Sequence, residues 1–183
     1  GDVVLDIGAN AGLYTVLAAR AVGESGHVYA FEPDPRAVAL LRNNIEINNL
    51  ANVTVIEAAA SNRSGTAALA AATDTAMSSL ADIDRQGQQI QEWRTVRTIR
   101  VDDAVEAYDI RSVTFIKMDV EGAEKLVLEG ASSLLGRASN ITILFEGFDQ
   151  NTHAFGYTVR ELLDALTSQG FSLQGFDRSL QLH

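Results

Sequence analysis

The sequence predicts one α/β domain with a mostly parallel, twisted sheet and helices on both faces. Short runs rich in apolar and β-branched residues alternate with helical patterns along most of the 183 residues. Many of these runs are apolar at consecutive positions, which is typical of strands buried on both faces. The length suits a single domain with a full core, and 46% hydrophobic residues exclude a mainly disordered chain.

Strands and helices alternate strictly over the first 58 residues. Strands are expected at residues 3–7, 27–31 and 53–58, and helices at residues 12–22 and 34–49. Asp34 suits the N-cap of the second helix, and Pro35 suits its first turn. Val38, Leu41 and Ile45 then follow at helical spacing.

The remainder contains further strands, a polar interruption and a terminal helix. Strands are expected at residues 66–72 (an edge strand), 95–101, 113–118 and 141–145, with a helix from about residue 123. Between the first two strands, residues 73–93 are polar and Gln-rich. Thr158 and Glu161 match a capping box that opens a helix ending at Gly170. From Phe171 onward we expect a closing pair of short antiparallel strands.

Composition excludes several classes of function. A net charge of −10 disfavours binding to nucleic acid or to anionic lipid, because both require clustered cations. The chain has no cysteine, which excludes disulfides and thiol chemistry and suggests a reducing, cytoplasmic location. No run of 18 apolar residues predicts a membrane span. Because the chain starts at Gly1 without Met, we expect the parent protein to have residues before it.

The loop after the first strand carries a ligand-binding signature. Gly8 and Gly12 allow a sharp turn, and Asn10 tolerates a left-handed backbone. The loop lacks the third glycine of the dinucleotide fingerprint, and Asp6 would repel a pyrophosphate. Glu32, at the end of the second strand, is placed to accept both hydroxyls of a ribose, although it could instead be a helix N-terminal charge. Together the two acids favour a cationic nucleoside.

Six sequence blocks carry a resemblance to a known family. They are VLDIGANAGLYT at 4–15, AFEP at 30–33, NNIEINNL at 43–50, NVTV at 52–55, ASNRSGTA at 60–67 and IKMDVEGAE at 116–124. These blocks resemble those of the FkbM-type family of S-adenosylmethionine-dependent methyltransferases. The resemblance covers nearly the whole chain and is weakest at residues 73–93 and after residue 151.

This resemblance implies a Rossmann-like class I methyltransferase fold and methyl transfer to an oxygen of a small molecule or sugar. It also implies the residues that hold the methyl donor. By position these are Asp6 at the methionine amino group, Gly8, Ala9, Asn10 and Gly12 along the methionine and ribose, Glu32 and Pro33 at the ribose, Ala60, Ser61 and Asn62 at the adenine, and Asp119 near the reacting centre.

Carboxylates near the ends of two later strands are candidates for the chemistry. Lys117, Asp119 and Glu121 alternate out of a buried strand, so they share one side. We expect Asp119 to act as donor anchor or base, with Glu121 supporting it and Glu146 as a second candidate base. Alternatively, Lys117 pairs with one acid and the other only charges a helix N-terminus. The spacing requires no metal, and we expect none.

The acceptor side is less defined by the sequence. We expect one domain over residues 1–183, with residues 73–93 as an acceptor-side insertion or lid. Arg85, Arg94, Arg97 and Arg100 could bind an anionic acceptor group or could balance the many acids. The expected partner is a small-molecule, sugar or glycolipid acceptor, and the oligomeric state stays open. Two other functions remain possible: a nicotinamide-dependent oxidoreductase and a non-catalytic domain that keeps the fold.

Overall fold

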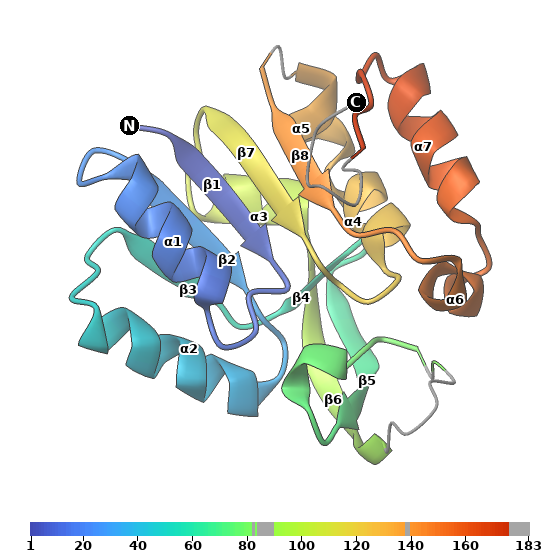
Figure 1. The fold of residues 1–183 in the computed structure, drawn as a ribbon, viewed down its shortest axis with the longest axis horizontal. Helices are drawn as coiled ribbons and strands as arrows, with labels where there is room; N and C mark the ends of the chain where they lie inside the picture. The colour runs from blue at the N-terminus through green and yellow to red at the C-terminus, as the bar shows by residue number, and fades with distance from the viewer. Residues whose placement is uncertain (82, 84–89, 138–139, 176–183) are drawn as a thin grey trace.

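The computed structural model describes residues 1–81, 83, 90–137 and 140–175 and contains a five-stranded parallel sheet (Figure 1). The strand order is β3-β2-β1-β7-β8. The strands are β1 (Val3–Ile7), β2 (His27–Phe31), β3 (Val53–Ile56), β7 (Val113–Met118) and β8 (Thr142–Phe145). All four strand pairs are parallel. Because the order reverses beside β1, the carboxyl end of β1 is the expected ligand-binding edge.

Helices cover both faces of this sheet, as the sequence predicts. They are α1 (Leu13–Val22), α2 (Pro35–Ile47), α3 (Val101–Ala107), α4 (Glu124–Gly130), α5 (Ser132–Arg137), α6 (Asp149–Thr152) and α7 (Val159–Ser168), with short 3-10 helices η1 (Thr75–Met77) and η2 (His153–Phe155). Val4 and Val28 pack against Ala19 of α1 on one face. On the other face, Leu5 belongs to the large core that includes Val127 of α4. The alternation of strand side chains therefore divides the core into two layers.

A second, smaller sheet lies beyond the carboxyl edge of the first (Figure 1). Its order is β4-β6-β5, with β4 (Ala59–Ser61) parallel and β5 (Gly65–Ala72) antiparallel to β6 (Ile90–Arg100). Arg36, at the start of α2, joins the two parts: its guanidinium pairs with Asp34 and donates to the carbonyl of Ala72 on β5 at 2.9 Å. The small sheet is thus fastened to the helix that follows β2.

Most predicted helices and strands are confirmed, with differences at their boundaries and in the short elements that connect them. The strand expected at 95–101 starts earlier, at Ile90, and ends at Arg100, because Val101 begins α3. β4, α3, α5 and α6 were not predicted, since each has seven residues or fewer and little periodicity. Residues 171–175, where a closing strand pair was expected, form no strand, and residues 176–183 lie outside the described residues. No helix in the described part of the chain is long and apolar enough to cross a membrane.

Candidate functional site

An open cavity of about 630 Å³, mouth included, lies where the carboxyl edge of the large sheet meets the small sheet. Its lining comes from four regions: the loop after β1, the end of β2, the chain entering β4, and the loop after β7, all facing a segment between β5 and β6. The lining residues are Gly8, Asn10, Phe31, Glu32, Pro33, Ala58, Ala59, Ala60, Leu69, Thr75, Ala76, Ser78, Ser79, Leu80, Asp119, Val120, Glu121 and Ala123. The lining therefore combines small apolar residues with three carboxylates, those of Glu32, Asp119 and Glu121.

The loop after β1 turns tightly against the neighbouring strands. Gly8 has a φ of 77°, and its N–H donates to the carbonyl of Phe31 at 3.0 Å. A Cβ on Gly8 would lie 1.9 Å from the carbonyl oxygen of Asp119, so the two loops touch through backbone. Gly12 (φ 94°) faces Leu41 instead and does not line the cavity; Ala9 is likewise buried in the core. Gly8 and Asn10 are the loop residues that the cavity exposes.

Glu32 presents a buried carboxylate to the cavity. Its side chain is only 7% exposed, and its two oxygens accept the backbone N–H groups of Asn10 and Asp34, each at 2.8 Å. Burial raises the pKa of Glu32 to about 7, against the lowering effect of those two hydrogen bonds. Asp34, two residues after Glu32, caps α2. Burial acts to raise the pKa of Asp34, but Arg36 and Arg94 lower it overall. Glu32 is thus the carboxylate that can still accept a ligand's hydroxyl groups.

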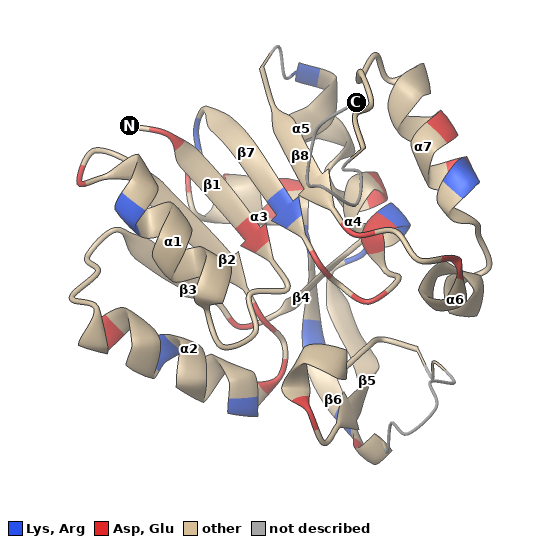
Figure 2. Ribbon diagram, viewed as in Figure 1, with Lys and Arg blue, Asp and Glu red and all other residues tan. Residues whose placement is uncertain are grey.

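Asp6 lies behind the loop rather than in the cavity. It is 1% exposed, and its Oδ2 accepts from the hydroxyl of Thr15 at 2.5 Å. The ammonium of Lys117 lies 3.3 Å from Asp6 Oδ1 and donates to the carbonyl of Gly8 at 2.8 Å. Figure 2 shows these opposite charges on β1 and β7, next to each other in the sheet. In this arrangement Asp6 does not line the cavity but holds Lys117 and the loop in place. Its contact with the methionine amino group, directly or through water, stays a prediction.

The loop after β7 brings two carboxylates into the cavity. The N–H of Asp119 donates to Ile7 at the end of β1 at 3.0 Å, and the carboxylate of Asp119 lies 3.9 Å from Lys117 Nζ. Glu121 has a φ of 55°, and its Oε2 accepts from the amide of Asn151 at 2.8 Å. Lys117 pairs closely with Asp6 and only distantly with Asp119, so the alternative assignment of Lys117 is partly correct.

Other predicted site residues divide into two groups. Pro33 and Ala60 line the cavity. Ser61 is buried within β4, and Asn62 is exposed and donates to Glu129 of α4 at 2.9 Å. Neither Ser61 nor Asn62 lines the cavity, because this part of the chain lines it earlier, at residues 58–60. Glu146 follows the edge strand β8, is exposed, and does not line the cavity either, so its assignment as a base is not supported by its position.

The sequence predicted only part of the remaining lining. Residues 75, 76 and 78–80 line one side, and they belong to the segment 73–93 that was expected on the acceptor side. Phe31, Ala58, Ala59 and Leu69 add apolar lining and were not predicted as ligand contacts. Small apolar residues next to strand ends are common in any core, so no pattern distinguishes them as ligand contacts.

The segment between β5 and β6 bridges the loop after β1 and the loop after β7. The hydroxyl of Thr75 donates to Asn10 Oδ1 at 2.8 Å, and that of Ser79 donates to the carbonyl of Glu121 at 3.0 Å. Ser79 also pairs with Ala70 of β5 through backbone hydrogen bonds. The segment thus spans the cavity from the β1 loop to the β7 loop.

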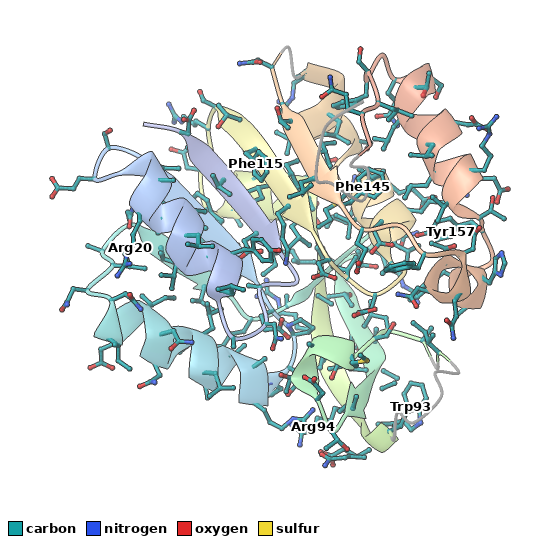
Figure 3. The ribbon with its side chains drawn as sticks, in the orientation of Figure 1. Arg20, Trp93, Arg94, Phe115, Phe145 and Tyr157 are labelled. Carbon is teal, nitrogen blue, oxygen red and sulfur yellow. The ribbon has the colours of Figure 1, made fainter. Side chains whose placement is uncertain are left out.

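The arginines of β6 do not reach this cavity. Arg94 pairs with Asp34 and Glu92, and Figure 3 shows it beside the start of α2. Arg100 pairs with Asp102 and lies 3.5 Å from Asp103, while Arg85 lies outside the described residues. Among the residues that the structure describes, no Lys or Arg lines the cavity. Within the same residues, no group of three His, Asp or Glu side chains could hold a metal ion.

Comparison with known proteins connects this geometry to a family. Residues 6–173 match the family model described as the methyltransferase FkbM domain. The 2-O-methyltransferase NoeI of Sinorhizobium fredii is 30% identical over 182 residues, covering 91% of this chain and 71% of NoeI. A probable cobalt-precorrin-6B C(15)-methyltransferase of Sulfolobus acidocaldarius is 49% identical over 57 residues, covering 31% of this chain and 30% of that protein.

Solved structures show the same fold. The FkbM methyltransferase of Methylobacillus flagellatus superposes with a TM-score of 0.60 at 18% identity, over 92% of this chain and 36% of that one. The precorrin-6y C5,15-methyltransferase of Geobacter metallireducens gives a TM-score of 0.55 at 14% identity, over 99% of this chain and 73% of that one. The chain thus spans about a third of the Methylobacillus chain and less than a third of the Sulfolobus relative.

Proposed function

The chain belongs to the FkbM methyltransferase family, a family of S-adenosylmethionine-dependent enzymes, and we propose that it methylates a hydroxyl oxygen of an uncharged small molecule, sugar or glycolipid. The observation that carries the proposal is the charge of the cavity. The charged residues among its described lining are Glu32, Asp119 and Glu121, all acidic. Such a cavity favours a sulfonium donor and disfavours the pyrophosphate of a nicotinamide cofactor.

The residues present fit the donor. Glu32 sits buried at the end of β2, with Oε2 bonded to Asn10 of the β1 loop and Oε1 bonded to Asp34. A carboxylate at this strand end suits the two hydroxyls of a ribose. Ala58, Ala59 and Ala60 form a flat apolar wall for the adenine. Gly8 and Asn10 leave backbone open toward the methionine. When bound, S-adenosylmethionine supplies an electrophilic methyl group on a positively charged sulfur.

The two carboxylates of the β7 loop take different parts in the proposed reaction. The backbone of Asp119 lies against Gly8, and its carboxylate lies 3.9 Å from Lys117 Nζ, so we assign its negative charge to the donor side. Glu121 lies beneath the segment around Ser79, on the acceptor side. Glu121 takes the proton of the acceptor hydroxyl while the acceptor oxygen bonds to the methyl carbon and the sulfur–methyl bond breaks. The acceptor becomes a methyl ether, and S-adenosylhomocysteine leaves uncharged.

The segment at 73–93 is proposed to cover the acceptor side of this single domain. Its described part carries the Thr75 and Ser79 hydroxyls, which donate to the loop after β1 and the loop after β7. These hydroxyls could exchange their present partners for the hydroxyls of an acceptor. NoeI, which is named as a 2-O-methyltransferase, supports transfer to oxygen.

The identity of the ligands can be tested directly. Titration calorimetry with S-adenosylhomocysteine should show binding, and titration with NAD should show none. Incubation with labelled donor and neutral oligosaccharides should then label the acceptor. Binding of NAD alone would favour an oxidoreductase, and binding of neither ligand a non-catalytic domain.

Acceptor charge should determine the rate. We expect a neutral oligosaccharide to be methylated with a kcat/KM at least tenfold above that of its phosphate ester, because Glu121 carries a negative charge on the proposed acceptor side and Asp119 carries another in the same cavity. The disadvantage of the ester should shrink in 0.5 M salt, where charges are screened. Equal rates for both acceptors at low salt would mean that the acceptor does not approach these carboxylates.

Asp119→Asn should show whether binding of the donor depends on its positive charge or on its shape. The variant should bind S-adenosylmethionine about tenfold more weakly but bind neutral S-adenosylhomocysteine with nearly unchanged affinity, since only the former loses an attraction between opposite charges. We expect kcat/KM to fall by about 10–100-fold. Glu106→Gln, an exposed acid on α3, provides the control. Unchanged affinity for both ligands would place Asp119 away from the sulfur.

A further inference from the structure

The loop that carries Glu121 has an unfavourable backbone conformation. Glu121 (φ 55°) and Gly122 (φ 99°) are consecutive residues in the left-handed region. For a residue with a side chain this conformation costs roughly 1–2 kcal/mol, so the surrounding contacts must impose it. The conformation has a consequence: it turns the Glu121 side chain away from the course of β7 and into the cavity.

Two buried side chains hold the backbone of this turn. The hydroxyl of Tyr157 donates to the carbonyl of Gly122 at 2.7 Å. The Oε1 of Glu124 accepts the N–H groups of Val120 at 3.4 Å and Gly122 at 3.3 Å. Burial raises the pKa values of both Tyr157 and Glu124, and Figure 3 shows Tyr157 at the junction of the α6 and α7 region with the rest of the fold. The turn is therefore held both by its own neighbour Glu124 and by Tyr157, which lies 35 residues further along the chain than Gly122.

Asn151 connects the same segment to the carboxylate itself. It belongs to α6, is 9% exposed, and donates from Nδ2 to Glu121 Oε2 at 2.8 Å. Its backbone approaches so closely that a Cβ on Gly122 would lie 2.5 Å from the Asn151 carbonyl oxygen. This buried amide therefore fixes Oε2 of Glu121, a residue that lines the cavity.

We propose that Asn151 is a positioning residue, which aims the Glu121 carboxylate at the hydroxyl of the methyl acceptor. The inference rests on the proposed function, in which Glu121 receives the acceptor's proton. Proton transfer in the reaction requires the base within hydrogen-bond reach, and small misplacements cost large factors in rate. Asn151 acts through Glu121 and touches neither ligand.

Asn151→Leu tests the proposal, because leucine keeps the approximate volume and removes the donor. We expect kcat to fall by about 10–100-fold, with the KM for the donor and the affinity for S-adenosylhomocysteine changed less than twofold. In a Glu121→Ala background the same substitution should lower kcat less than twofold further, because no carboxylate remains to be aimed. A purely structural role would give the same loss in both backgrounds.

Asn52→Leu is the matched control. Asn52 precedes β3, at the opposite edge of the sheet, and its amide donates to the carbonyls of Ala19 and Gly23, each at 2.9 Å. Its loss should lower the melting temperature about as much as Asn151→Leu does while leaving kcat unchanged. Wild-type kcat in Asn151→Leu, or equal losses with and without Glu121, would overturn the positioning role.

A crystal structure of Asn151→Leu separates this inference from the proposed function. We expect the Glu121 carboxylate to leave its position in the cavity while Asp119 stays in place. If Glu121 keeps its position, the inference is wrong whatever the acceptor is. If the wild-type protein methylates no hydroxyl acceptor but Glu121 moves in the variant, the proposed function fails and the structural role of Asn151 stands.

Discussion

Replacement of Glu32 by glutamine weakens the binding of S-adenosylhomocysteine by about 10–100-fold. Glutamine has one acceptor oxygen in place of two and no charge, while the cavity keeps the same shape. A hydrogen bond to a charged group contributes about 1.5–3 kcal/mol, and 1.4 kcal/mol corresponds to a factor of ten. Titration calorimetry of both proteins measures the effect, and Glu46→Gln, an exposed acid on α2, should bind as the wild type does.

The pH dependence of binding should identify Glu32 independently. In the free protein burial raises its pKa to about 7, so the carboxyl group is mostly protonated at pH 6 and mostly ionised at pH 8. Ribose hydroxyls bind the ionised form, so affinity should rise about tenfold from pH 6 to pH 8. Glu32→Gln should remove this rise. A rise that persists in the variant would assign the titration to another group.

Gly8→Ala should have the largest effect on stability. The glycine has a φ of 77°, which costs a residue with a Cβ about 1–2 kcal/mol, and the new Cβ would lie 1.9 Å from the backbone oxygen of Asp119. Forced separation of the two loops adds about 1–3 kcal/mol, as overpacking does elsewhere. We expect the free energy of unfolding, measured in urea, to fall by about 2–5 kcal/mol, with loss of donor binding.

Gly136→Ala is the matched control for this change. Gly136 lies in α5, and a Cβ there would meet no atom within 4 Å. Alanine favours a helix over glycine by up to about 1 kcal/mol, so this variant should be as stable as the wild type or more so. If Gly8→Ala is equally well tolerated, the β1 and β7 loops are not packed as the structure has them.

Local pattern was enough to predict the elements of the large sheet. The boundaries of β1, β2 and β7 agree with the sequence prediction, because each is a short, mainly apolar run between polar or glycine residues. The division into two sheets was not predictable in this way. Whether β5 and β6 pair with the large sheet or separately depends on contacts such as Arg36 with Ala72, which join residues far apart in sequence. Val101 illustrates the same limit, since a β-branched residue begins α3.

The site was predictable where chemistry is marked by unusual residues and less so elsewhere. Gly8, Glu32 and Asp119, which were predicted to bind the donor, all line the cavity, because glycine and acids at strand ends stand out in a sequence. Their contacts with the donor stay a prediction. The position of Asp6 behind the loop could not be predicted, because period-two alternation gives the face of a strand but not whether a neighbouring lysine pairs with the acid. Asn151 carries no local signal: its partner is 30 residues away, and a short polar helix resembles a loop.

The separate small sheet has a consequence for how such enzymes diversify. Glu32 and the β1 loop lie on the large sheet, whereas Leu69 and the Thr75–Ser79 bridge come from the hairpin region of the small one. The hairpin is anchored mainly by the edge pairing of β4 with β6 and by Arg36. Exchange or lengthening of the chain between β5 and β6 would therefore change the part of the cavity that this segment lines, while the lining residues that follow β1, β2 and β7 stay the same.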